Sequence, residues 1–379
     1  MTTDIWSLPG PARLASSIGD ALRDGGSCAV VAPARVRREG HWVFGAADAA
    51  DVGVDHVEIE AARPPAAVFA DHCGATWMPG PGMVTELARH EVLAGRIIGL
   101  TLPPRTPEWA AFTAAFLTAL PAIPEQDRPQ LLVFCGPDDL SKFRSQRLPI
   151  TERWWWGAVG RLDTTIAASQ ALGDRADPVM VACITEVCGY DLTFVDTLAQ
   201  SWDGSLDGLL NIVKGAAEPE ATVEESSSLS GTLAGVFPPP RLQSDWDRGV
   251  ANAWERYEPF IAPTAVPERH RTEVLRNRVW RGQLRELMPL VDEERARLEA
   301  WARSGPITER NVSYPIEIGY LTKLVYDDPS LRRRSSHLRR RAAAWLRDTR
   351  NTLAHRDIVS PADISEGLSL LDADRRQHG

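Results

Sequence analysis

One stretch of the sequence divides the chain into two parts with different hydrophobic patterns. Residues 216–247 change to Glu, Ser, Pro and Gly, including the string EESSSLSG and three prolines at 238–240. Such a composition buries too little apolar surface to offset the entropy lost on ordering. We therefore predict a flexible linker over 216–247 between domains at residues 1–215 and 248–379, and a chain of 379 residues is long enough for two cores.

Short β-rich segments alternate with helical segments before the linker. Strands are predicted at Ser27 to Val31, Val57 to Ile59, Arg96 to Leu102, Leu131 to Cys135 and Val179 to Ile184. Helices are predicted at Trp109 to Leu120 and Arg161 to Leu172, with closing helices over 191–213. This alternation is typical of an α/β domain with a largely parallel sheet.

Three segments beyond the linker have helical periodicity and are rich in Arg, Leu, Glu and Ala. They run from Glu268 to Arg303, from Pro315 to Tyr326 and from Leu331 to His355. We predict an all-α domain, a helical bundle, over residues 248–379.

The composition indicates in which cellular compartment the protein is found. Apolar residues make up 44% of the chain and charged residues 25%, as in folded globular proteins. No apolar run approaches the roughly 20 residues that span a bilayer, and residues 1–10 lack the pattern of a signal peptide. We expect a cytoplasmic protein that does not contact a membrane.

The five cysteines lie in apolar segments and include no CxxC pair. We interpret them as buried, reduced thiols, although Cys183 and Cys188 could also form a metal site or a redox pair. We predict no metal site and no cofactor.

The amino-terminal half has the look of a nucleotide-binding core without its phosphate loop. The strings DGGSCAVVAPARV, residues 24–36, and LLVFCGPDD, residues 131–139, suggest a strand after glycines and a strand ending in acidic residues. A working loop needs GxxxxGK[ST] after its strand, because the lysine neutralises the β and γ phosphate oxygens. The three lysines, Lys142, Lys214 and Lys323, do not fit that spacing. Arg35 is a poor substitute, so we predict no ATP hydrolysis.

The layout of these segments, together with ITEVCGYDLTFVDTLAQSWDG at residues 184–204, resembles the inactive relatives of STAND NTPases found in bacterial conflict systems. The resemblance covers residues 15–215. It implies a degenerate, P-loop-like domain that senses or docks within an antiviral defence system. The alternative is an unrelated α/β domain in which Gly25 and Gly26 form a turn and Asp138 and Asp139 cap a helix.

A run of three tryptophans, Trp154 to Trp156, cannot lie on one face of a helix or a strand. We expect at least one of them to be exposed or at a partner surface. A loop folded over the edge of the core is the alternative.

The string RDTRNTLAHRDIVSP, residues 347–361, contains a candidate catalytic group, Arg350-Asn351-x-x-x-His355. On a helix Asn351 and His355 share a face, and Arg350 lies one position earlier. An imidazole can move the proton of an RNA 2′-hydroxyl, while a guanidinium stabilises charge on the phosphate, without a metal. One helix supplies one Arg and one His, so an acid and a base on opposite sides of the phosphate require two protomers.

This string resembles the motif of the HEPN family of helical domains. In that family an Arg-polar-x-x-x-His motif at a helix end forms a metal-independent endoribonuclease site across a dimer. The resemblance implies that Arg350, Asn351 and His355 are catalytic, that the substrate is RNA and that the protein is a homodimer. The alternative is a non-enzymatic adaptor of a multi-protein defence complex, in which Arg350 and His355 hold the bundle together.

Two arginine clusters precede the motif. Residues 241–379 carry 25 basic and 21 acidic side chains, whereas the whole chain has a net charge of -9. We predict nucleic-acid contacts, or alternatively a solvated helix face, for Arg332, Arg333, Arg334, Arg339, Arg340 and Arg341.

Overall fold

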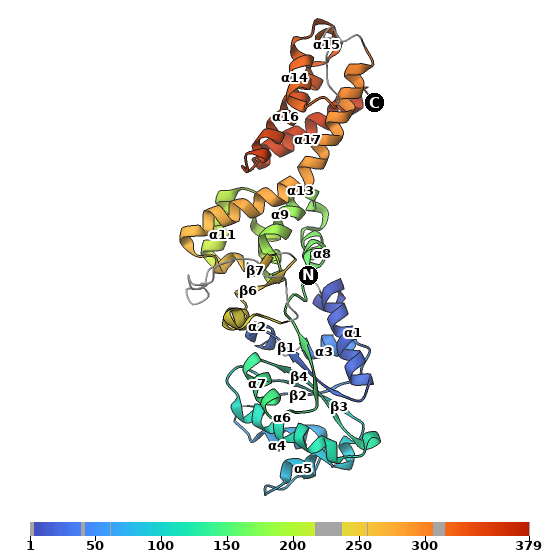
Figure 1. Ribbon diagram of the computed structural model, residues 1–379, viewed down its shortest axis with the longest axis vertical. Helices are drawn as coiled ribbons and strands as arrows, with labels where there is room; N and C mark the ends of the chain where they lie inside the picture. Colours follow the sequence, from blue (N-terminus) through green and yellow to red (C-terminus); the bar gives the residue numbers. More distant parts are fainter. Residues whose placement is uncertain are drawn as a thin grey trace. The chain divides into compact units, whose positions relative to one another are not determined.

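The computed structural model describes residues 4–38, 42–60, 62–216, 237–255, 257–305 and 315–378. These residues form two compact units (Figure 1). The α/β unit contains residues up to 166 together with 237–265, and the helical unit contains residues 167–216 together with 266–378. The boundary falls within helix α8 (Arg161–Leu172).

A five-stranded parallel sheet forms the centre of the α/β unit, in the order β2-β3-β4-β1-β5. Nearly every residue of the two central strands β1 and β4 is buried, which explains why these strands are continuous apolar runs in the sequence. The prediction of an α/β domain with a parallel sheet is confirmed. The strands are β1 (Ser27–Val31), β2 (Asp55–Val57), β3 (Ile97–Thr101), β4 (Gln130–Cys135) and β5 (Ile150–Trp154).

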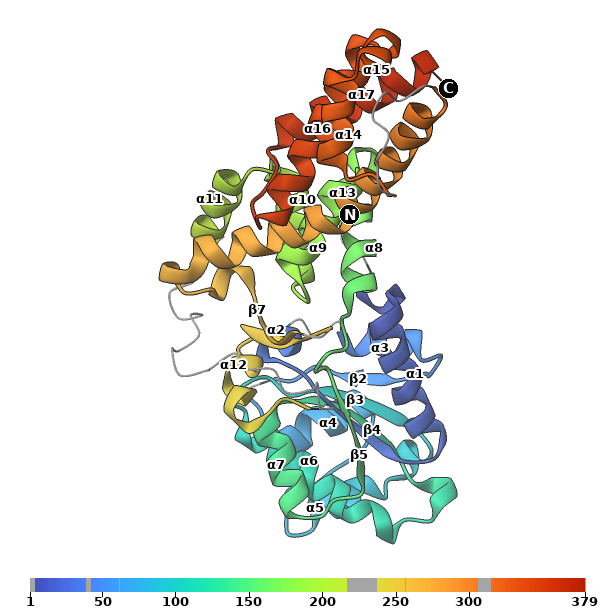
Figure 2. The same ribbon diagram turned by 45° about the horizontal axis from the view of Figure 1, so that its top comes forward.

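Helices cover both faces of this sheet (Figure 2). Helices α1 (Pro9–Arg23) and α3 (Trp42–Ala49) pack together on one face. The other face is covered by α4 (Pro65–Cys73), α6 (Pro107–Ala119) and α7 (Pro137–Ser145), and the unit also contains the short helices α2 (Ala34–Arg38) and α5 (Met83–Ala88). Gly25, with φ +80°, turns the chain from α1 into β1, as the alternative interpretation of this glycine pair expected.

The second part of the predicted linker is folded. Residues 217–236 lie outside the described residues, but α12 (Gln243–Asp247) and a hairpin of β6 (Ala251–Trp254) and β7 (Tyr257–Ile261) follow them within the α/β unit. Trp246 of α12 is fully buried. The structure therefore differs from the expectation of a linker up to residue 247 and of an all-α domain from 248, because this segment has its own apolar anchor.

Two of the three consecutive tryptophans pack against Trp246. The ring centroids of Trp154 and Trp156 lie 5.6 and 6.5 Å from that of Trp246. Trp155 points elsewhere and meets Trp6 edge to face at 5.5 Å. Trp155 and Trp156 are buried and Trp154 is half-buried, so none of the three is an exposed aromatic, contrary to the expectation of an exposed tryptophan.

The helical unit is arranged along one long helix, α13 (Glu268–Arg303). One buried cluster joins the first half of α13 to α9 (Pro178–Cys188), α10 (Leu192–Ser201) and α11 (Leu206–Ala216). A second cluster joins its other half to α14 (Ile318–Asp327), α15 (Pro329–Arg334), α16 (His337–Ala354) and α17 (Pro361–His378). The predicted closing helices of the first domain thus belong to the helical unit.

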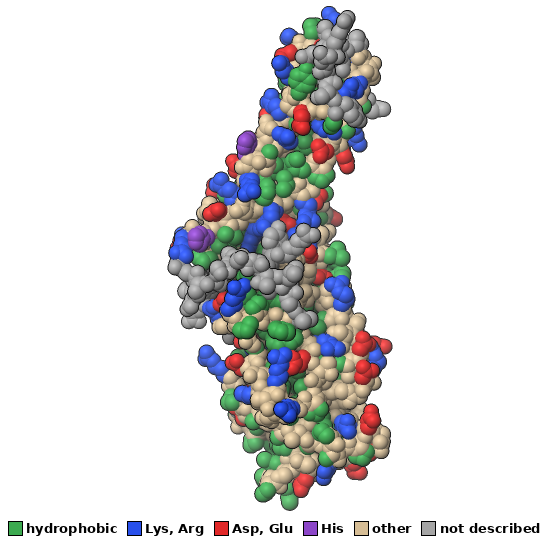
Figure 3. All heavy atoms as spheres, viewed as in Figure 1, with side chains coloured by type: hydrophobic (Ala, Val, Ile, Leu, Met, Phe, Trp, Pro, Cys, Tyr) green, Lys and Arg blue, Asp and Glu red, His purple; other side chains and the backbone are tan. Residues whose placement is uncertain are grey.

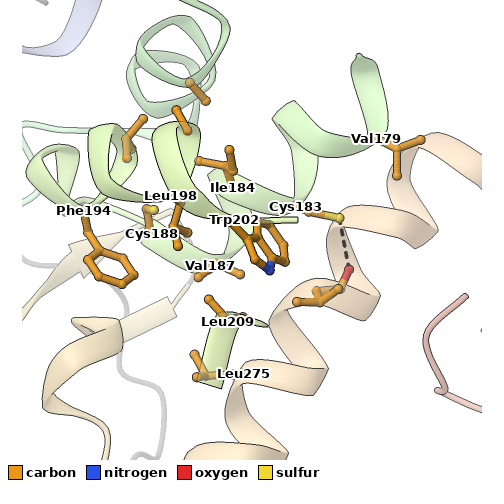
Figure 4. Close-up of a cluster of buried hydrophobic side chains, with 14 of the residues drawn as sticks. Val179, Cys183, Ile184, Val187, Cys188, Phe194, Leu198, Trp202, Leu209 and Leu275 are labelled. Carbon is orange, nitrogen blue, oxygen red and sulfur yellow. Dashed lines mark hydrogen bonds between the residues drawn. The ribbon is translucent and has the colours of Figure 1, made fainter. Parts of the chain in front are cut away.

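The predicted strand at Val179 to Ile184 is part of helix α9. Asp177 caps this helix by accepting hydrogen bonds from the N–H groups of Val179 and Met180, and Pro178 occupies the first turn. A Cβ on Gly282 of α13 would lie 2.5 Å from the Cα of Cys183, so glycine permits the close crossing of the two helices. Figure 4 shows Cys183 pointing at the carbonyl of Val279, with a sulfur to oxygen distance of 3.6 Å. A short apolar run alone does not distinguish a buried helix from a strand.

All five cysteines are buried and none forms a disulfide, as predicted. Burial raises the pKa of the Cys28 thiol to about 12 and that of Cys73 to about 11, which keeps both in the unreactive protonated form. Within the described ranges, no helix is both long and apolar enough to cross a membrane.

Candidate functional site at the end of helix α16

Helix α16 carries the Arg-Asn-x-x-x-His motif in its last turn. The predicted helix from Leu331 to His355 is interrupted, because Ser336 is extended and its hydroxyl caps α16 by accepting from the N–H of Arg339. At the other end His355 is the C-cap residue that follows Ala354, and its N–H donates to the carbonyl of Asn351. The motif is therefore fixed at a helix end, as the sequence predicted.

A left-handed residue turns the chain just after the motif. Arg356 has φ +60°, and its N–H donates to the carbonyl of Leu353, while the N–H of Asp357 donates to that of Thr352. These are the two hydrogen bonds of a Schellman cap, in which glycine is the usual left-handed residue. The conformation costs roughly 1 to 2 kcal/mol for a side chain with a Cβ.

The three motif side chains are open to solvent. Asn351 and His355 are exposed, and the Arg350 side chain is 41% exposed. Arg350 donates to Glu317 at 3.4 Å, and because both side chains are exposed this ion pair contributes little to stability. Within the described residues, the imidazole of His355 makes no hydrogen bond or ion pair. A phosphate can therefore reach both groups.

The helix end is fastened to α13 by other side chains. The indole N–H of Trp280 donates to the carbonyl of Leu353 at 2.8 Å. The buried Gln283 donates to the carbonyl of Val359 and accepts from its N–H, both at 2.8 Å. These bonds fix the backbone on both sides of His355 while leaving its ring free.

One motif supplies only part of a reaction site. No hydrogen bond joins Arg350 to His355 within the part of the chain described, and each is present once. An imidazole can serve as a base or an acid near neutral pH, and a guanidinium can bind phosphate oxygens through two parallel hydrogen bonds. One motif thus supplies a single side chain that can act as an acid or a base near neutral pH.

The six predicted nucleic-acid arginines do not form one free surface. Arg339 is buried, donates to Asp374 and lies over the ring of Trp301, and Arg334 lies over the same ring. Arg341 pairs with Glu366, and Arg340 donates to the backbone carbonyls of residues 332 and 335. Only Arg332 and Arg333 are exposed with no side-chain partner in the described ranges. Figure 3 likewise shows basic side chains interspersed with acidic ones over the helices on the face drawn.

The α/β unit contains a second candidate ligand site, at the carboxyl ends of its strands. In open α/β sheets ligands bind at the carboxyl ends of strands where the strand order reverses. Here β1 leads to β2 at one edge of the sheet, while the neighbouring β4 leads to β5 at the other edge. The residues that follow β1 and β4 therefore line the expected crevice.

This crevice is filled by the side chain of Arg37. Its guanidinium donates to the carbonyls of Ala32 at 3.0 Å and Leu102 at 3.1 Å, and to the carboxylate of Asp247 at 2.8 Å. Arg37 is only 4% exposed. A Cβ on Gly136, just after β4, would lie 2.8 Å from a guanidinium nitrogen, so glycine is needed for this approach.

The other residues considered for nucleotide binding have structural roles. Asp139 accepts a hydrogen bond from the N–H of Gly136 at the start of α7, as a helix cap does. Burial raises the pKa of Asp139, and this hydrogen bond and the nearby Lys142 only partly offset the rise. Arg35 is exposed on the short helix α2. Sequence reasoning missed Arg37 and Asp247, because the partners of Arg37 lie up to 210 residues away.

Comparison with family models, with curated proteins and with solved structures finds no match to this chain.

Proposed function

We propose that the helical unit is a metal-independent endoribonuclease that acts as a homodimer. The observation that carries this proposal is the open position of Arg350 and His355 at a helix end whose backbone is fixed by Trp280 and Gln283. A histidine kept only for packing would be buried with a polar partner, and His355 is exposed.

The reaction needs only groups that two copies of the motif supply. His355 of one protomer takes the proton of the RNA 2′-hydroxyl, whose oxygen attacks the adjacent phosphorus. Arg350 binds the phosphate oxygens as negative charge develops on them. The protonated imidazole of the second motif gives a proton to the leaving 5′-oxygen. The products are a 2′,3′-cyclic phosphate and a 5′-hydroxyl, and Asn351 positions the scissile phosphate.

The α/β unit has a docking role in this proposal, within a prokaryotic defence system. The side chain of Arg37 lies where a ligand would bind in the crevice, and the segment directly after β1 contains no lysine. The unit would therefore recruit other proteins without turning over a nucleotide.

A non-enzymatic adaptor is the second candidate. It is favoured by the internal partners of four of the six arginines, which leave less positive charge for a phosphate backbone. The anchoring of the helix end by Trp280 and Gln283 weakens its premise that His355 holds the bundle together.

The experiment is cleavage of end-labelled single-stranded RNA in excess chelator. We expect wild-type protein to cut at a rate per protomer that falls on dilution below the dimer dissociation constant. Arg350→Ala should lower the rate by about a hundredfold, since it removes charge stabilisation in the transition state. Arg347→Ala, a matched change one turn earlier on α16, should cut normally. Absence of cleavage at every concentration, with dimer present, would favour the adaptor.

A further inference from the structure

The helical unit contains a pocket of about 460 Å³ that the proposed nuclease does not use. It lies where α13, α16 and α17 meet, and its volume is within the range of small-molecule sites, roughly 300 to 1,000 Å³. Its apolar lining includes Leu298, Trp301, Leu346 and Leu371, together with Ala342 and Ala343. These two alanines of α16 leave the space, because larger side chains there would fill it.

Charged side chains gather around this apolar lining. One oxygen of Glu294 accepts from Arg297 at 2.8 Å and from Arg375 at 2.5 Å. The Glu294 side chain is only 8% exposed, whereas both arginines remain largely open to solvent. Arg339 donates to Asp374 at 3.2 Å, and its guanidinium lies 4.5 Å from the centre of the Trp301 ring.

The pocket lining has more guanidiniums than carboxylates. Arg297, Arg339 and Arg375 face Glu294 and Asp374, and Arg375 also donates to Asp372, beside the pocket, at 3.3 Å. Each guanidinium has five N–H donors, and the hydrogen bonds to carboxylates occupy one donor of Arg297 and three of Arg375. Donors of both arginines therefore remain for a second anion.

Packing alone does not account for this arrangement. Burying the carboxylate of Glu294 and the guanidinium of Arg339 costs desolvation energy, and apolar side chains of similar volume often stabilise a protein equally well or better. An apolar hollow with a few convergent polar groups is instead the usual form of a ligand site.

We propose that this pocket binds a small organic anion with an apolar body. The apolar part lies against Leu346, Leu371 and the two alanines, and the anionic group pairs with Arg297 and Arg375. A phosphate, a carboxylate or a sulfonate satisfies this geometry, because each offers two oxygens to a guanidinium.

The probe for this test is 1-anilinonaphthalene-8-sulfonate, an apolar double ring with one sulfonate, and its uncharged analogue is N-phenyl-1-naphthylamine. We expect the full-length wild type to bind the sulfonate at one site per chain, measured by titration calorimetry. The affinity for the sulfonate should fall as salt is added, whereas that for the uncharged analogue should be weaker and independent of salt.

Arg375→Gln should weaken binding of the sulfonate about tenfold, since a hydrogen-bonded charge is lost. Arg376→Gln makes the same change on the neighbouring residue, which does not line the pocket, and should bind as the wild type does. Ala342→Leu should also reduce binding by filling the hollow. Equal affinities for Arg375→Gln and Arg376→Gln would overturn the proposal. If Arg375→Gln fails to fold, tight and salt-independent binding of both probes to the wild type would overturn it instead.

Discussion

Single buried charges connect segments that are far apart in the sequence. Arg37 joins the ends of β1 and β3 to Asp247, and Glu299 joins two turns of α13 to the segment before α14. Each of these groups was taken out of water, and its hydrogen bonds must offset that cost. Removing one partner therefore leaves the others buried and unsatisfied.

Glu299 gives the helical unit a measurable dependence on acid. Burial by itself raises the pKa of a carboxyl, but bonds from Arg303, Ile316 and Arg295 outweigh it and hold the pKa of Glu299 below its usual 4.5. The unfolded chain then binds the proton more readily, so the stabilisation is present above pH 4.5 and is lost as pH falls through the folded pKa.

Glu299→Gln should therefore lower the free energy of unfolding at pH 7 by about 1 to 3 kcal/mol. The loss should shrink below pH 4, as followed by urea denaturation at a series of pH values. Glu293→Gln, an exposed carboxylate on the same helix, is the control and should have no such effect. A loss that stays constant from pH 7 to pH 3 would contradict the assignment.

The position of Arg37 in the crevice predicts that the protein does not bind ATP there. Because its guanidinium fills the crevice, adding Mg-ATP should not raise the melting temperature of the wild type, and ATP should not be hydrolysed. Arg37→Ala should lower the free energy of unfolding by about 2 to 4 kcal/mol, since it leaves the buried carbonyls of Ala32 and Leu102 and the partly buried carboxylate of Asp247 without a donor. Arg35→Ala, two residues earlier and exposed, should change little. A shift of several degrees with ATP in the wild type would show that the crevice opens.

The helix bounds were predictable from the sequence only where the sequence contains a clear end signal. Helices α8 and α13 have the bounds predicted from the sequence, because apolar residues at helical spacing continue up to a clear break. The prediction failed where that information was missing. Residues 179–184 are apolar on all sides because α9 is buried nearly all round. The break at Ser336 depends on one hydroxyl that caps α16.

The left-handed conformation of Arg356, just after His355, predicts that a glycine at this position stabilises the protein. Arg356→Gly should raise the free energy of unfolding of the helical unit by up to about 1 kcal/mol, because glycine adopts φ +60° without a steric cost. Arg356→Ala retains a Cβ and should give no such gain. Thermal denaturation of the two variants provides the comparison. Equal stabilities for Gly and Ala would show that the left-handed turn costs nothing here.

The two structural units of the molecule have other boundaries than the domains predicted from the sequence composition. The composition changes at residue 216, but residues 167–216 pack with the helices that follow residue 266, and residues 237–265 return to the α/β unit. A composition shift contains no information on which of the two units the segments on either side of it join. The fold classes of the two halves were thus predictable, whereas their boundaries depended on long-range packing.

Only those features of the candidate site that depend on neighbouring residues in the sequence were predictable. The spacing of Arg350 and His355 placed them at a helix end, and the structure has them there and open to solvent. The partners of the arginine clusters were not predictable, because Asp374 and Trp301 lie on other helices. The pocket beside Arg339 was missed for the same reason, since its lining comes from three helices.

The most direct test of the account is the single-turnover cleavage of labelled RNA by His355→Ala, in excess chelator and at a concentration where the protein is dimeric. His337→Ala, an exposed histidine at the other end of α16, is the control. The account predicts that His355→Ala loses cleavage by at least about a hundredfold with an unchanged melting temperature, while His337→Ala cleaves like the wild type. Equal cleavage by the two variants, or a wild type without cleavage, would contradict it.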